Sequence, residues 1–140
     1  MNFETIINWL ENKVNYCLSE LSQRLGVDWI VEQGTSGIWT YEKWNSGKAE
    51  CWGLWTTTSK FPNAYGGAYE SASSLNKSLP SGLFIEVVPL FSGAASTSNG
   101  AWLENPRAST TGVTTYVMNV VKQTSPIDVS IYAKVTGRWK

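Results

Sequence analysis

Histidine is absent from this chain, and cysteine occurs only twice among its 140 residues. Without histidine there is no Ser-His-Asp triad, no Cys-His dyad and no zinc site with a histidine ligand. Cys17 and Cys51 cannot by themselves supply a four-thiolate metal site. They fall in a predicted helix and a predicted strand, which favours two buried free thiols over one disulfide. These absences exclude much enzyme chemistry, and we expect no metal and no cofactor. Since the remaining acidic candidates, discussed below, are expected to be solvated, we also expect no enzymatic activity.

Charge is also scarce, because charged residues make up 16% of the chain, with 11 basic and 11 acidic residues. Nucleic acids and anionic membranes bind basic protein surfaces, so a formal net charge of zero argues against both as partners. No apolar run approaches the roughly 18 residues of a transmembrane helix. Glu4 lies where a signal peptide would be basic. The sequence thus predicts no nucleic-acid partner, no membrane insertion and synthesis in a cytoplasm.

Residues 3–25 have the periodicity of an amphipathic helix, and Gly26 predicts its end. Such a helix is marginal alone in water, so its apolar side must pack on something. Self-association is favoured, while the number of helices and docking onto the chain's own β domain remain open. We expect an oligomerisation stem over residues 1–26 and a second domain over residues 27–140. The apolar side chains recur at alternating spacings of four and three residues, as in a heptad seam, and are Phe3, Ile7, Leu10, Val14, Cys17 and Leu21.

After residue 26, short β-branched and aromatic runs separated by Gly, Ser, Asn and Pro predict an antiparallel β-sandwich or barrel. Two long segments lie on either side of Thr124-Ser125-Pro126, which predicts a hairpin. Residues 60–79 and 92–100 are predicted loops, where binding residues often lie. The expected strands are residues 28–33, 37–44, 48–57, 83–91, 101–104, 111–123 and 127–139, with 83–91 apolar enough to be buried.

An aromatic hairpin surrounds Asn45-Ser46-Gly47. A three-residue loop gives Gly47 the left-handed position and sets Glu42 opposite Glu50, whereas a two-residue loop pairs Lys43 with Glu50. Turn geometry favours the three-residue loop. In either register both faces carry aromatic side chains, so one face is core and the other meets a subunit or a sugar. The glutamates are expected to be solvated rather than catalytic. The aromatic residues are Trp39, Tyr41, Trp44, Trp52 and Trp55.

Two phrases, GIWTYEKWNSGKAECWG at residues 37–53 and TGRWK at residues 136–140, resemble the C-terminal domain of tail-fibre and baseplate proteins from phages and prophages of Gram-positive bacteria. Residues 57–128 match only in their texture of short strands and small polar loops. Glu42 departs from the family pattern, in which a basic residue is common, and Lys134-Val135 is an extra pair within the closing segment. The motif carries no assigned ligand contacts.

The resemblance implies a virion protein, a homotrimeric fibre tip with an upstream coiled coil, that contacts the host cell surface. The expected partners are other copies of the chain and a cell-wall polysaccharide. From composition, the candidate receptor contacts are Tyr65, Tyr69 and Trp102. The alternative is a stand-alone carbohydrate-binding module that uses Trp39, Trp52 and Trp55 as its platform.

Overall fold

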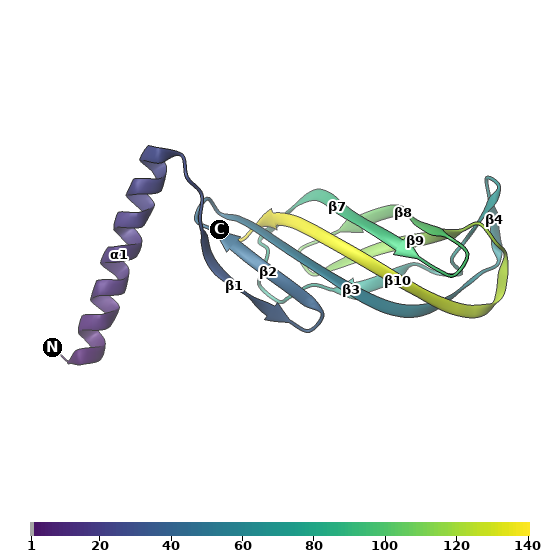
Figure 1. Ribbon diagram of the computed structural model, residues 1–140, viewed down its shortest axis with the longest axis horizontal. Helices are drawn as coiled ribbons and strands as arrows, with labels where there is room; N and C mark the ends of the chain where they lie inside the picture. Colours follow the sequence, from purple (N-terminus) through teal and green to yellow (C-terminus); the bar gives the residue numbers. More distant parts are fainter. Residues whose placement is uncertain (1) are drawn as a thin grey trace.

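The computed structural model describes residues 2–140, and it describes the side chains of all of these except residues 22, 23 and 87–91. One helix precedes an elongated, mainly antiparallel β-sandwich (Figure 1). The elements are α1 (Phe3–Leu25), β1 (Ile30–Ser36), β2 (Trp39–Trp44), β3 (Lys48–Phe61), β4 (Asn63–Tyr65), β5 (Ala68–Glu70), β6 (Leu75–Ser78), β7 (Glu86–Ser96), β8 (Ala101–Ala108), β9 (Gly112–Asn119) and β10 (Gln123–Arg138).

The predicted helix is confirmed with its bounds. Asn2 caps it, because its Oδ1 accepts a hydrogen bond from the Thr5 backbone nitrogen at 2.8 Å. Gly26 ends it in the left-handed conformation, with φ of 64°. The helix stands clear of the sandwich along most of its length (Figure 1). Among the described residues, no helix combines the length and apolarity needed to cross a bilayer.

The sandwich has two layers. Sheet A has the strand order β1-β2-β3-β10-β7. In sheet B, β9 is central, with β8 along one side and β5 and β6 in succession along the other. The core between the sheets is apolar and includes Trp39, Trp55, Phe61, Val117 and Ile131. The long β3 and β10 pair over most of their length and form the spine of the molecule (Figure 1).

The β2–β3 turn has the favoured three-residue register. Trp39 pairs with Gly53, and Glu42 stands opposite Glu50. Gly47 has φ of 93°, which an L side chain rarely adopts, so the turn residue decides the register. The two glutamates tolerate this pairing because Lys48 and Lys134 neutralise Glu50, as described below.

The predicted hairpin between the last two long strands is wrong, because β9 and β10 lie in different sheets. The chain leaves sheet B at Asn119, whose Oδ1 accepts a hydrogen bond from the Val121 backbone nitrogen at 2.9 Å. The residues expected to form the turn, Thr124-Ser125-Pro126, lie inside β10 at an irregularity between Gln123 and Ile127. A local polar turn at Asn119 therefore outweighs the β-forming Val120-Val121 pair.

Both predicted loops are also partly wrong. Residues 60–79 contain β4, β5 and β6, with Gly66-Gly67 as a tight turn between β4 and β5. β7 extends to Ser96, and a Cβ at Gly93 within it would meet the Tyr132 carbonyl oxygen and the Leu103 side chain. The expected burial of residues 83–91 is confirmed only for Leu83 and Phe84, because Ile85 is 66% exposed and Glu86, where β7 begins, is exposed. Residues 87–91 lie outside those whose side chains are described.

Candidate functional site

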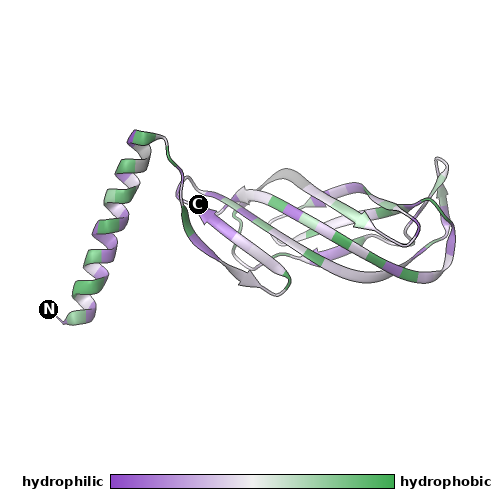
Figure 2. Cartoon of the chain, in the orientation of Figure 1, coloured by the Kyte–Doolittle hydropathy of each residue, from purple (hydrophilic) through white to green (hydrophobic). Residues whose placement is uncertain are grey.

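The seam of α1 is an extended exposed apolar surface among the residues whose side chains the structure describes. Its apolar residues are 38% to 79% exposed, the extremes being Ile7 and Phe3. Figure 2 shows apolar residues distributed along the whole helix, although it lies apart from the sandwich. Cys17 is free and exposed on this seam, so the expected burial of its thiol is wrong for the single chain. Burial of Cys51 is confirmed, and desolvation raises the pKa of its thiol to about 12.

The aromatic hairpin divides between core and surface. Trp39 and Trp55 are buried and their rings lie 6.2 Å apart at a tilted angle. Tyr41 crosses β1, with its ring against Gly34 and its hydroxyl donating to Glu32 at 3.1 Å. The suggested sugar platform of Trp39, Trp52 and Trp55 therefore does not form, because two of its three rings are inside the core.

Trp52 lies on the outer face of sheet A beside two exposed residues. Leu54 and Tyr132 stand directly opposite each other in the β3–β10 register and are 61% and 42% exposed. Next to this apolar band, Glu50 accepts from Lys48 at 2.9 Å and from Lys134 at 2.8 Å. Burial raises the pKa of the Glu50 carboxyl, but the hydrogen bonds from the two lysines outweigh it and leave the pKa below its usual value. A carboxylate held ionised in this way is a poor general acid.

The two phrases that carry the family resemblance come together at one end of the sandwich, here called the base. Trp139 donates from its backbone nitrogen to the oxygen of Gly47 at 3.0 Å and from Nε1 to the oxygen of Trp44 at 2.9 Å. Lys48 lies over the Trp44 ring, with 4.6 Å between its Nζ and the ring centroid. Lys43 lies over Trp139 in the same way, at 5.4 Å. The base is thus closed by the Trp139 hydrogen bonds and by the two lysine–tryptophan contacts.

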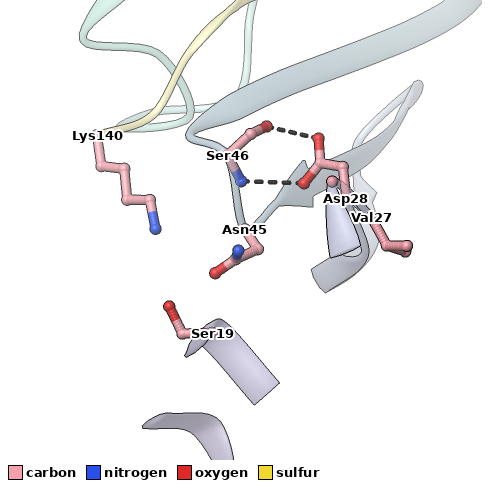
Figure 3. Close-up of a pocket in the computed structure, with 7 residues that line it drawn as sticks. Ser19, Val27, Asp28, Asn45, Ser46 and Lys140 are labelled. Carbon is pink, nitrogen blue, oxygen red and sulfur yellow. Dashed lines mark hydrogen bonds between the residues drawn. The ribbon is translucent and has the colours of Figure 1, made fainter. Parts of the chain in front are cut away.

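A cleft of about 390 Å³ separates the base from the end of α1. Asp28 fixes its wall by accepting from the backbone nitrogen and Oγ of Ser46 at 3.0 and 2.5 Å. Figure 3 shows Ser19, Asn45 and Lys140 turned toward the opening, from the helix, the β2–β3 turn and the C-terminus. The cleft is lined mostly by polar residues, and the Asp28–Ser46 hydrogen bonds hold the linker that follows α1 in place.

The predicted receptor contacts are separated by the fold. The sheet register aligns Trp102, Met118, Glu70 and Asn63 across one face of sheet B. Tyr65 shares that face because it lies two residues after Asn63. Tyr65 and Trp102 are 60% and 43% exposed, whereas Tyr69 faces the other way and packs against the core.

No protein family, curated protein or solved structure matches this chain.

Proposed function

We propose that this chain is a non-enzymatic structural protein of a bacteriophage, a homotrimeric fibre or baseplate domain that contacts the host cell surface. The observation that carries the proposal is the exposed apolar seam of α1. A helix of 23 residues with this much uncovered apolar surface needs a partner of its own kind or another surface to cover it. Self-association into a parallel stem covers the seam and leaves the sandwich outside it.

The width of the apolar side favours three helices over two. Ile6, Leu18 and Leu25 flank the seam at positions where a two-stranded coil usually carries charge, and they are all more than a third exposed. A third helix buries these flanks. The family resemblance of residues 37–53 and 136–140 implies the same number of chains.

The placement of the two motif segments supports the division into stem and tip. They form the base, which joins the stem, so their aromatic residues serve to close the sandwich next to the oligomerisation helix. The β4–β5 turn lies at the opposite end of the spine (Figure 1). That end is free to meet a receptor, and Tyr65 and Trp102 are its exposed aromatic residues. A host cell-wall polysaccharide is the receptor that fits such aromatic and hydroxyl-bearing surfaces.

The test is the native mass of the intact chain, measured by light scattering on a sizing column. We expect three chains for the wild type and for Asn15→Asp, a nearly isosteric change outside the seam. We expect fewer chains for Val14→Asp, which places a charge inside it. Removal of residues 1–26 should lower the number of associated chains in the same way. A wild-type monomer would reject the proposal, and a trimer without the helix would move the interface to the sandwich.

A further inference from the structure

A groove crosses the side of the sandwich between the base, with which it shares Lys43, and the distal aromatic residues. It consists of two adjoining hollows of about 360 and 250 Å³ that share Ser36, Pro80 and Ser81. One wall is the tip of the β1–β2 hairpin, and the other is the turn that follows β6. Trp39 and Tyr41 line it from β2, between these walls.

Both walls are fixed before any ligand arrives. Leu79, Pro80 and Leu83 are buried, and the Leu83 backbone nitrogen donates to the Pro80 oxygen at 3.3 Å. The Trp39 indole ties the two walls together by donating to the Ser78 oxygen at 2.7 Å. A groove with walls held in this way loses little conformational entropy on binding.

The lining offers polar groups that the described protein does not use. The hydroxyls of Thr35, Ser36 and Ser81 make no hydrogen bond to any described residue, and all three residues are exposed. At one end, Lys43 and Glu32 form an ion pair at 2.9 Å next to the Tyr41 ring. Hydroxyls, a neutralised charge pair and an aromatic edge together match the alternating polar and C–H surfaces of a sugar chain.

The other end of the groove carries a cation. Lys77 lies on β6 beside Ser78, is half-buried, and has no ion pair or hydrogen bond among the described residues. Lys43, by contrast, is already neutralised by Glu32. The groove is therefore neutral at one end and positive at the other, which selects a ligand with one anionic substituent.

We propose that this groove binds a short glycan segment that carries an anionic substituent, phosphate or carboxylate, with the anion at Lys77 and sugar hydroxyls at Ser36 and Ser81. The inference rests on the proposed function in its choice of a cell-surface glycan. It differs from it in the place of binding, because the predicted contacts Tyr65 and Trp102 lie on another face of the sandwich.

The test uses the full chain on a printed array of bacterial polysaccharides with neutral, carboxylated and phosphorylated members. We expect binding to anionic members and at least tenfold weaker binding by Lys77→Ala, with Lys77→Arg retaining it. Carboxylated and phosphorylated members tell which anion is preferred. Ser81→Ala should weaken binding by a smaller factor. Lys122→Ala, which removes an exposed lysine between β9 and β10, is the matched control and should bind normally.

The native mass of each sample separates this inference from the proposed function. A trimer that binds no array member, or binds neutral and anionic members equally, would overturn the groove and leave the assembly standing. Binding that is lost in Tyr65→Ala and Trp102→Ala but kept in Lys77→Ala would place the glycan at the distal end instead. If Lys77→Ala changes the native mass, the groove is a contact between chains, and the inference is overturned.

Discussion

The indole nitrogen of Trp139 donates a hydrogen bond to the backbone oxygen of Trp44, across 95 residues of sequence, at 2.9 Å. This bond connects the end of the last strand to the aromatic hairpin and closes the base of the sandwich. Trp139→Phe keeps an aromatic ring but removes the donor, so the Trp44 carbonyl keeps only the hydrogen bond from the Gly47 backbone nitrogen at 3.0 Å. We expect the free energy of unfolding to fall by about 0.5–1.5 kcal/mol in urea titrations, the usual net value of one hydrogen bond. Trp102→Phe, at an exposed ring, should change it much less.

Glu50 should make stability depend on pH. Its folded pKa is below the ordinary value of 4.5, so its contribution is present above that value and is lost as the pH falls through the folded pKa. Urea unfolding should show Glu50→Gln less stable by about 1 kcal/mol near neutral pH. The difference from wild type should shrink as the pH falls below 4.5. A difference that stays constant down to the acid limit would contradict this account.

The matched comparison for Glu50 is Glu32. The hydrogen bond from Lys43 lowers the pKa of the Glu32 carboxyl, although burial opposes it, and this residue is exposed. Solvent screens exposed pairs, so Glu32→Gln should change the pH dependence less than Glu50→Gln does. An equal effect from both variants would mean that burial beside Lys134 does not explain the contribution of Glu50 to the pH dependence of stability.

Cys17 should report the number and direction of the helices. In a parallel stem the Cys17 thiols share one layer, and mild oxidation should cross-link pairs of chains. A trimer leaves about one chain in three uncross-linked, because each disulfide uses two thiols, whereas a dimer can be cross-linked completely. In an antiparallel pair the Cys17 positions are separated by roughly 9 Å along the axis, beyond disulfide reach. Non-reducing gels measure the three outcomes, and Cys17→Ser is the control.

Gly137 and Gly34 should differ in their tolerance of alanine. A Cβ at Gly137 would meet the backbone oxygen of Glu86 and the Phe84 ring, where β10 pairs with the start of β7. A Cβ at Gly34 would meet the outer end of Tyr41, a side chain that can move. We expect Gly137→Ala to lower the unfolding free energy by about 1–3 kcal/mol or more, and Gly34→Ala to cost less. Thermal unfolding of the two variants checks the order.

The sequence predicts those parts of the fold that are encoded locally. Apolar spacing gives the bounds of α1, and Gly47 gives the register of the aromatic hairpin. The passage of the chain from sheet B to sheet A after Asn119 is missed, because the turn depends on one buried amide, whereas the two valines that follow it favour a continuous strand. The short β4 to β6 are missed because strands of three or four residues are too short for an alternating pattern to be recognised.

The candidate sites also divide into those encoded by local sequence and those formed by tertiary packing. The seam of α1 is visible in the sequence because all of its residues belong to one helix. The groove is not visible, since its walls come from residues 36–38 and 78–83, which only tertiary packing brings together. The exposure of Tyr65 and the core packing of Tyr69 also depend on sheet register, which composition does not give.

The spine formed by β3 and β10 has a mechanical consequence. The two strands run along the long axis of the sandwich, and β10 spans about 50 Å at the usual rise per residue. α1 and the C-terminus are both attached at the base, so the distal end is a closed set of turns without a chain end (Figure 1). A pull applied between α1 and the β4–β5 turn runs through β1, β2 and β3, so it loads the hydrogen bonds between these strands along the strand direction, in shear, while β10 holds β3 along most of its length. Under the proposed function, this arrangement suits a domain that is pulled along its long axis while its tip is held.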